Sequence, residues 1–329
     1  MIRTSHVGSF PLEYSEENIE RIVRDLYDIG IDVPPYPQMR SFIDIYLEPL
    51  VKAGILTKRH NHYFIDIDEA KYSKLPHFKI VEAESTINYI NRLGLKFKAL
   101  RAPVTGVFTL ASRIYVEKDP SIGLRATLLP HLDIMRDLLM KYVREFIKYL
   151  LDLGFNVIFI DEPILGVIVG RKRILYGLSE NDIIEIIDSV LRNFSVEKGI
   201  HVCGRISDKL FRILVQVSNL KYMNFEFYDT PKNLDVIETE ILESYDKFIA
   251  PGIASSRKLV IEDINAMVKI LNEVFRRARR RIDLVSADCG FGELRSFSRN
   301  SMEPYRASII KLRNIVRAVD MFRGSIGVS

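Results

Sequence analysis

Two cysteines, one histidine and one glutamate stand in three short segments that each read as the end of an apolar strand. The segments are 201–204 (His-Val-Cys-Gly), 224–227 (Asn-Phe-Glu-Phe) and 287–290 (Ala-Asp-Cys-Gly). Histidine nitrogen, cysteine sulfur and carboxylate oxygen are the usual ligands of tetrahedral zinc. In an extended His-x-Cys segment both side chains lie on the same face of the strand. The sequence therefore predicts a Zn²⁺ site made of His201, Cys203, Glu226 and Cys289.

The alternative is that the two thiols are ordinary buried side chains, since free cysteine often behaves as a small apolar residue. The chain has only two cysteines, however, and both fall in this set. A structural zinc ribbon needs four closely paired ligands, whereas these ligands spread over residues 201–289. Such spacing favours an open, catalytic zinc site.

The composition indicates a globular protein of a reducing compartment. Among 329 residues, 47 are basic and 43 acidic, which gives a net charge of +4. This balance argues against a nucleic acid or a membrane surface as partner. No apolar run resembles a secretory signal or a membrane span, and two cysteines do not suggest a disulfide framework, so we expect a cytoplasmic protein. Glutamine occurs only at positions 38 and 216, which is typical of a heat-adapted source.

Strand-like and helix-like segments alternate from residue 97 onward. The segment 97–108 is expected to be a strand that leads into a loop, 121–153 a long helical region broken by Pro130, and 179–194 a capped helix. Repeated β-α-β units imply a parallel sheet, and about eight such units favour a closed (β/α)₈ TIM barrel, with a doubly wound sheet as the alternative. We expect one domain over residues 1–329, with an excursion outside the barrel around 55–80.

A run of arginines at 276–281 could suggest a phosphate or nucleic-acid site. It ends an amphipathic helix, however, where cations are favoured by the negative end of the helix dipole. It also lies at the opposite end of the units from the predicted ligands. We therefore interpret it as a solvated helix end.

The motifs together resemble those of cobalamin-independent methionine synthases, in particular the catalytic C-terminal domain and its short archaeal forms, which have barrels like that of uroporphyrinogen decarboxylase. The segment 4–11 matches the family's Thr-x-Gly-Ser-Phe-Pro, 102–105 its Gly-Pro-Val-Thr, and 160–163 its Ile-Asp-Glu-Pro. The four predicted zinc ligands match the family's ligands in identity and order. These matches extend from residue 4 to about residue 290, which is nearly the whole chain.

The resemblance implies a zinc-dependent methyltransferase that acts on the thiol of homocysteine and forms methionine. Zinc would convert the weakly acidic thiol into a reactive thiolate. By the same resemblance Val7, Gly8 and Ser9 would hold the amino-acid end of homocysteine, and Asp161 would pair with its ammonium group. Gln38 lies where the family has a Gly-Glu-Pro-Glu-Arg segment and is a further expected substrate contact. From the residues alone, Gly8-Ser9 could equally be a plain turn and Asp161 a helix N-cap.

The side of the family's site that binds the methyl donor is not retained. The family stacks its folate on a tryptophan after the Pro-Val-Thr motif, but this chain contains no tryptophan. The family's folate-binding glutamate corresponds to Val167, and its catalytic histidine has no counterpart in the segment 251–256. These departures predict a methyl-corrinoid donor, either methylcobalamin or a corrinoid carrier protein, in place of methyl-tetrahydrofolate.

Two alternatives to this function remain open. The segment His201-Val202-Cys203-Gly204 also resembles the motif of methylcobalamin-dependent methyltransferases that act on other thiols, such as coenzyme M. A non-catalytic zinc-binding subunit is the other possibility. The complete set of ligands argues against the second, and the motifs at 8–11 and 161–163 favour homocysteine over coenzyme M.

Overall fold

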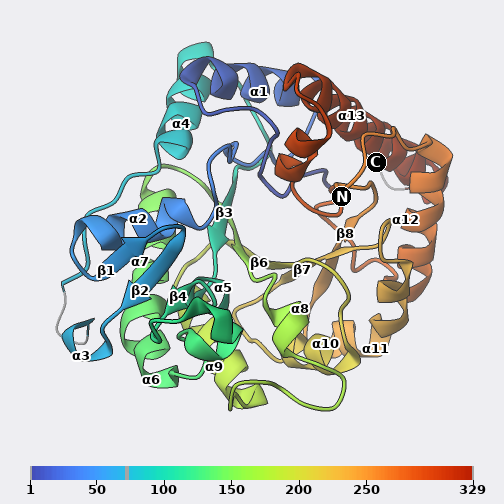
Figure 1. The fold of residues 1–329 in the computed structure, drawn as a ribbon. Helices are drawn as coiled ribbons and strands as arrows, with labels where there is room; N and C mark the ends of the chain where they lie inside the picture. Colours follow the sequence, from blue (N-terminus) through green and yellow to red (C-terminus); the bar gives the residue numbers. More distant parts are fainter. Residues whose placement is uncertain (1, 71–73, 328–329) are drawn as a thin grey trace.

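The computed structural model describes residues 2–70 and 74–327, which form a closed barrel of parallel strands surrounded by helices (Figure 1). Five strands form one continuous parallel sheet in the order β3 (Arg101–Thr105), β5 (Val157–Asp161), β6 (Glu197–Val202), β7 (Tyr222–Glu226) and β8 (Phe248–Gly252). Every position of β3, β5 and β7 is buried. This burial explains the apolar run of β5, since such strands are covered on both faces.

Three further segments close the barrel through single bridges. All of these bridges are parallel. The last segment is joined to β8 through Ile282 and Ser286, and to the first segment through Val285 and Thr4. The first segment is joined to the second through Ser5 and Val33, and the second to β3 through Pro35 and Arg101. The first, second and eighth strand positions of the barrel are thus occupied by segments 4–5, 33–35 and 282–286. The predicted (β/α)₈ barrel is confirmed, and the doubly wound alternative is wrong because the sheet has no open edges.

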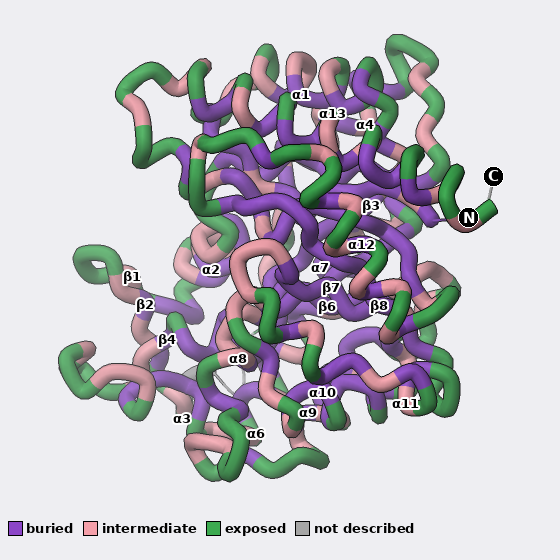
Figure 2. Tube along the Cα trace, turned by 90° about the vertical axis from the view of Figure 1, so that its right-hand side faces the viewer, coloured by how far each residue is buried: buried purple, intermediate pink, exposed green. Residues whose placement is uncertain are grey.

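Each barrel strand is followed by a helix of the outer layer, and Figure 1 shows these helices as a ring around the strands. In chain order they are α1 (Glu16–Asp28), α4 (Val81–Leu93), α7 (Lys141–Asp152), α9 (Glu180–Leu191), α10 (Asp208–Val215), α11 (Thr239–Ser244), α12 (Ile264–Ala278) and α13 (Met302–Ser325). The side view in Figure 2 shows buried chain through the centre and exposed turns outside. No helix within residues 2–70 and 74–327 is long and apolar enough to cross a membrane.

The remaining elements lie in connections. They are α2 (Asp44–Lys52), α3 (Ile67–Ala70), α5 (Val107–Ala111), α6 (Leu132–Ile134) and α8 (Leu165–Ile168), together with 3₁₀ segments at Pro120–Ala126, Pro231–Val236 and Gly292–Phe297 and a π segment at Met135–Met140. Strands β1 (Leu56–Arg59), β2 (His62–Ile65) and β4 (Ile114–Tyr115) form a small sheet apart from the barrel. Residues 55–70 and 74–80 of the predicted excursion contain β1, β2 and α3; its remaining residues, 71–73, lie outside the described residues.

Two expected elements differ from the structure. The strand expected at 97–108 is confined to β3, and helix α5 follows it directly. The region 121–153 is broken around Pro130 as expected, but the part before the break is a 3₁₀ segment that begins at Pro120 and not a regular helix. The expected helix at 179–194 is confirmed as α9, where Ser179 and Asp182 form a reciprocal capping box.

Gly252, at the end of β8, has no side chain, so the segment after the eighth strand position can approach the end of β8 closely. A Cβ atom at residue 252 would lie 2.5 Å from Asp288 Cα and 2.9 Å from Asp288 N. Ile253 N donates to Ser286 O (2.9 Å) and Asp288 N donates to Ala254 O (2.9 Å). The missing side chain therefore fixes the position of the segment that carries Cys289.

Replacing Gly252 with alanine should push this segment outward and lower the free energy of unfolding by about 1–3 kcal/mol, as overpacking usually does. Chemical denaturation would measure the change. Gly324→Ala is the matched control, because a Cβ there has no atom within 4 Å and alanine favours the helix. Wild-type stability of Gly252→Ala would contradict this account of the close approach.

Candidate metal centre and substrate pocket

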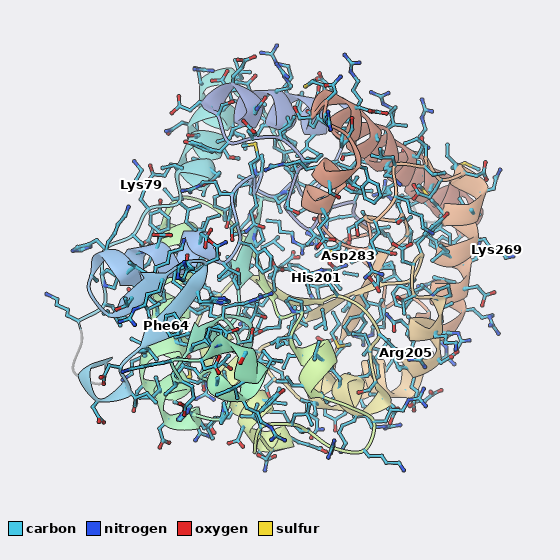
Figure 3. The ribbon with its side chains drawn as sticks, in the orientation of Figure 1. Phe64, Lys79, His201, Arg205, Lys269 and Asp283 are labelled. Atoms are coloured by element: carbon cyan, nitrogen blue, oxygen red, sulfur yellow. The ribbon has the colours of Figure 1, made fainter. Side chains whose placement is uncertain are left out.

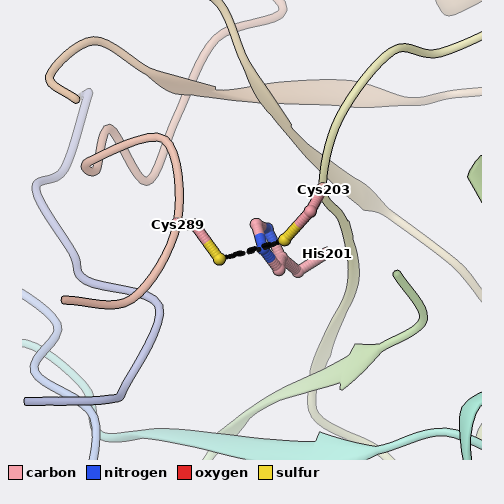
Figure 4. Close-up of side chains that lie close together, drawn as sticks. All are labelled: His201, Cys203 and Cys289. Atoms are coloured by element: carbon pink, nitrogen blue, oxygen red, sulfur yellow. Dashed lines mark hydrogen bonds between the residues drawn. The ribbon is translucent and has the colours of Figure 1, made fainter. Parts of the chain in front are cut away.

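His201, Cys203 and Cys289 bring their side chains together at the carboxyl end of the barrel strands (Figure 4). His201 Nε2 lies 2.9 Å from Cys203 Sγ and 3.3 Å from Cys289 Sγ, and the two sulfur atoms are 3.0 Å apart. We call these three residues the thiol–imidazole cluster. Figure 3 shows His201 near the centre of the barrel. This is the end at which TIM-barrel enzymes place their active sites.

The donor atoms of the thiol–imidazole cluster fit a zinc ion. Around tetrahedral zinc, sulfur and nitrogen ligands lie roughly 3.5–3.8 Å from one another, as follows from Zn–S near 2.3 Å and Zn–N near 2.0 Å. The observed separations, 2.9–3.3 Å, are shorter by roughly 0.2–0.8 Å, so the side chains would have to move outward by less than an ångström to admit the ion. Three protein ligands leave a fourth position for substrate, as in catalytic zinc sites.

The cluster also favours a thiolate. A hydrogen bond from Cys203 and the nearby His201 lower the pKa of the Cys289 thiol well below its ordinary value, although burial opposes this. The same sulfur–sulfur hydrogen bond, together with burial, raises the pKa of Cys203 well above its ordinary value. This contact therefore favours the thiolate at Cys289 and the thiol at Cys203.

Asn224 on β7 orients the imidazole of His201. His201 Nδ1 lies 2.9 Å from Asn224 Oδ1. The amide orientation is fixed because Asn224 Nδ2 donates to Ala250 O (2.6 Å) and to Ser286 Oγ (3.2 Å). His201 Nδ1 must therefore donate to Asn224, which leaves Nε2 free to bind a metal. Metal-binding histidines commonly have such an outer partner.

Asp288 joins the segment of Cys289 to the loop after β7. Its carboxylate accepts hydrogen bonds from the backbone N–H groups of Phe227 (3.1 Å), Tyr228 (3.1 Å) and Asp229 (2.6 Å). Burial raises the pKa of Asp288 to about 8, although these hydrogen bonds oppose the increase. The residue before Cys289 thus sets the position of that thiol relative to β7.

Glu226, the fourth predicted ligand, ends β7 but is not part of this close group. Its fully buried carboxylate accepts from Arg257 Nη2 at Oε2 (2.9 Å) and Oε1 (3.2 Å), and Oε1 also accepts from Thr230 Oγ1. The structure therefore brings three of the four predicted ligands together and directs the fourth toward an arginine.

A cavity of about 190 Å³ opens beside the thiol–imidazole cluster. We call it the mouth pocket. Four of the five predicted substrate residues line it, together with the three members of the cluster and six other residues. The complete lining is Val7, Ser9, Gln38, Phe42, Asp161, Pro163, His201, Cys203, Ser256, Arg257, Cys289, Gly290 and Glu293. The fifth, Gly8, lies beside Gln38 with φ +147°, and a Cβ there would lie 2.9 Å from Pro103 Cγ. Segments separated by nearly the whole chain therefore meet at this pocket.

Asp161, at the end of β5, faces the mouth pocket with an unsatisfied oxygen. Its Oδ1 atom is buried and has no hydrogen-bond partner among the described residues. Burial raises the pKa of Asp161 to about 7, although His201 and Arg101 lower it. It does not cap a helix, since α8 begins after Ile164. An orphaned carboxylate oxygen at a cavity wall is a site for a cationic group.

Ser9 brings the first strand segment against the segment that follows Cys289. Its Oγ accepts from Gly292 N (3.1 Å), and its carbonyl accepts from Phe291 N (2.8 Å). A Cβ at Gly290 would lie 2.1 Å from Ser9 Oγ, so only glycine permits this approach. The hydroxyl hydrogen of Ser9 has no acceptor among residues 2–70 and 74–327 and can donate into the pocket.

Sequence reasoning missed Asn224 and Arg257. Asn224 could have been found, because it precedes Glu226 by two positions on the same strand face. No such signal was available for Arg257, because it lies in an irregular loop and only the folded chain brings it to Glu226.

On the expected donor side, Phe108 is fully buried, whereas Val167 is 61% exposed. Phe108 therefore offers no exposed aromatic face after the Pro-Val-Thr motif. An exposed valine replaces the expected carboxylate and cannot accept a hydrogen bond.

No protein-family model matches this chain. Two curated relatives, both named methionine synthase, match nearly its whole length. The protein from Sulfolobus acidocaldarius is 23% identical, with 98% of this chain and 87% of the relative covered. The protein from Methanothermobacter thermautotrophicus is 27% identical, with 96% of this chain and 98% of the relative covered.

Among solved structures, a B12-independent methionine synthase from Shewanella sp. W3-18-1, in complex with selenomethionine, has the same fold. Its TM-score is 0.69 at 14% identity, and 99% of each chain is covered. The sequence motifs predicted a methyltransferase of the methionine synthase type, and the names of these relatives agree with that class. The resemblance to the cobalamin-independent methionine synthases, first indicated by the motifs, is confirmed across the length of the chain and by the fold.

Proposed function

We propose that this protein is a zinc-dependent methyltransferase that transfers a methyl group to the thiol of homocysteine and forms methionine. The observation that carries the proposal is the mouth pocket, where the thiol–imidazole cluster and the orphaned carboxylate of Asp161 face one small cavity. A thiol to be activated and an ammonium group to be recognised are the two ends of homocysteine.

His201, Cys203 and Cys289 would hold the zinc, with Glu226 as a further ligand only if it leaves Arg257. Bound zinc would supply deprotonation of the incoming thiol at neutral pH, because a thiol bound directly to zinc loses its proton. The methyl group then moves from the donor to sulfur, so that an S–C bond forms as the donor's bond to methyl breaks. Asn224 contributes by keeping Nε2 of His201 unprotonated.

The other end of the pocket fits an amino acid. Asp161 pairs with the ammonium group, which provides the missing partner for its buried oxygen. The Ser9 hydroxyl and the neighbouring backbone of Val7 and Gly8 provide polar contacts for the carboxylate. A volume of about 190 Å³ is below the 300–1,000 Å³ typical of drug-sized ligands, so the pocket suits homocysteine and leaves the donor outside.

The same carboxylate separates homocysteine from the alternative acceptor, coenzyme M. Coenzyme M carries a sulfonate and no ammonium group, so it would bring a second anion to Asp161 without relieving the unpaired oxygen. The structure of the pocket therefore favours an amino-acid thiol.

For the donor, we propose a methyl-corrinoid, free or on a carrier protein. The names of the similar proteins do not indicate a corrinoid donor, and the Shewanella enzyme is named B12-independent. The proposal rests on this chain's own donor side, which has no tryptophan, no aromatic face at Phe108 and an exposed Val167 in place of a carboxylate. A folate would lose both stacking and a hydrogen bond here.

The metal assignment predicts one zinc per chain. His201→Ala and Cys289→Ser should each lose most of the metal, because two remaining strong ligands cannot complete the site. Metal analysis after purification would measure this, with His77→Ala as the control, since His77 is exposed and outside the pocket. Full zinc occupancy in a Cys203→Ala, Cys289→Ala double variant would exclude the assignment.

Asp161→Asn should weaken homocysteine binding roughly 10- to 150-fold, because a charge-assisted hydrogen bond to the ammonium group contributes about 1.5–3 kcal/mol. Calorimetry with the zinc-loaded enzyme would measure the loss. Binding of 3-mercaptopropionate, which has no ammonium group, should change little. An equal loss for both thiols would show that Asp161 only supports the fold.

The same variant should be more stable than the wild type at pH 8 but not near pH 4. The folded pKa of Asp161 is raised to about 7 from an ordinary value of 3.8. Between these values the unfolded chain has released the proton while the folded protein retains it, so the wild type loses stability as pH rises. Asparagine does not titrate. Denaturation at several pH values should show the difference growing from pH 4 to pH 7, and a constant difference would contradict it.

Methionine formation with methylcobalamin and with methyl-tetrahydrofolate at equal concentration tests the donor. We expect clear turnover with methylcobalamin and little with the folate, since each lost stacking contact alone weakens folate binding by on the order of 1 kcal/mol. A preference for the folate would overturn the corrinoid donor while leaving homocysteine methylation intact. Turnover with neither donor, in zinc-loaded protein that binds homocysteine, would indicate that a carrier protein is needed.

A further inference from the structure

The side chain of Arg101, at the start of β3, is a fully buried cation inside the barrel. None of its three guanidinium nitrogens has a hydrogen-bond partner among the described residues, so no carboxylate there accepts from it. Burying a charge without such a partner costs free energy, and buried polar groups without partners are rare in proteins. The position of this cation therefore needs an explanation other than the stability of the fold.

The ring of Phe159 holds the guanidinium in the interior of the barrel. The guanidinium carbon of Arg101 lies 3.8 Å from the centre of that ring. The ring reaches from β5 to β6, where a Cβ atom at Gly199 would lie 2.3 Å from Phe159 Cζ. His201, near the centre of the barrel in Figure 3, follows Gly199 by two positions on the same face of β6. The cation thus lies close to the strand that leads into the thiol–imidazole cluster.

The charge of Arg101 reaches the metal centre and the mouth pocket without contact. Burial lowers the pKa of Arg101 to about 10, and the negative charges of Asp161 and Cys289 oppose this decrease. The guanidinium therefore remains protonated at neutral pH. Arg101 does not line the mouth pocket, so it acts on a bound ligand through its electric field.

We propose that Arg101 supplies the counter-charge that favours the thiolate form of bound homocysteine and so makes the mouth pocket prefer homocysteine to methionine. The inference rests on the proposed function. When homocysteine binds there, the S–H proton leaves to solvent and the negative charge stays on the sulfur inside the protein. A fixed cation nearby offsets part of the cost of burying that charge, because Coulomb interactions are stronger in the protein interior than in water.

The same charge favours release of the product. Methyl transfer forms an S–C bond as the donor's bond to methyl breaks, and the electron pair of the broken bond stays with the donor. The sulfur of methionine is therefore a neutral thioether, which gains no stabilisation from Arg101. Substrate and product carry the same ammonium and carboxylate groups, so the contacts with Asp161 and Ser9 do not distinguish them. Arg101 distinguishes them by the charge on the sulfur.

Calorimetry of homocysteine and methionine binding to the zinc-loaded protein tests this role. Arg101→Met and Arg101→Gln both remove the charge but differ in shape and polarity. Each should weaken homocysteine binding roughly 10- to 50-fold, as expected for one unit charge acting across a protein interior, and change methionine binding by no more than about twofold. Lys258→Gln is the matched control, because it removes the same charge from an exposed position beside Arg257, where water screens it.

The stability of the protein without ligand separates this role from a structural one. A buried cation without a partner does not stabilise the fold, so neither neutral variant should unfold at a lower denaturant concentration than the wild type. A structural arginine would give the opposite result, with a lower midpoint and an equal loss of affinity for both amino acids. Failure of both neutral variants to fold would contradict the proposal as well.

Proton release distinguishes failure of this inference from failure of the proposed function. Calorimetry of the wild type with homocysteine, in buffers of different ionisation enthalpy, measures the released proton. If none is released, the bound sulfur is not a thiolate, and the proposed function and this inference both fail. If one proton is released, yet the ratio of homocysteine to methionine affinity is the same in the wild type and the Arg101 variants, the function stands and the role of Arg101 is refuted.

Discussion

Closure of the barrel through its first strand segment is the constraint on which the site depends. Thr4 pairs with Val285 on one side and Ser5 with Val33 on the other, so the N-terminal segment lies between the second and the last strand positions. Ser9 thereby reaches the segment of Cys289, and Gly290 allows the contact. The sheet is continuous only from β3 to β8, and single bridges complete the circle. Without them Cys289 and Ser9 would not face Cys203.

Buried polar groups that the fold leaves unsatisfied lie at the mouth pocket, as Asp161 does, and elsewhere in the protein, as His6 and Arg101 do. Asp161 Oδ1 and His6 Nδ1 have no partner among the described residues, and neither do the guanidinium nitrogens of Arg101. The Arg101 guanidinium lies 3.8 Å from the centre of the Phe159 ring inside the barrel, and burial lowers its pKa to about 10. Such groups reduce stability, and a substrate ammonium at Asp161 would recover part of that loss on binding. Ligand binding and protein stability are therefore coupled through this carboxylate.

The barrel, and the grouping of three of the four predicted metal ligands, could be predicted from local sequence patterns. Apolar strands that end in His201, Cys203 and Glu226 predicted where the metal ligands lie, because parallel strands share one active end. The eighth strand position was recognised by its motif at 287–290, although only single bridges form there. The direction of the Glu226 side chain could not be predicted, since its partner Arg257 comes from another loop. The 3₁₀ segment before α6 and the π segment after it, which replace a regular helix, could not be predicted either.

Under the proposed function, the mouth pocket would admit the thiol and leave the methyl donor outside, and this would determine how the methyl group arrives. Under the proposed function, an amino acid in this cavity of about 190 Å³ would direct its sulfur to the thiol–imidazole cluster. The donor's methyl must then approach that sulfur from the open side of the barrel, between the loops after β5 and β8. Val167 lies exposed in the first of these loops and Arg257 in the second. Neither side chain is aromatic and able to stack on a flat ring, so under the proposed function contacts farther out on the rim, such as those of a carrier protein, would orient the donor.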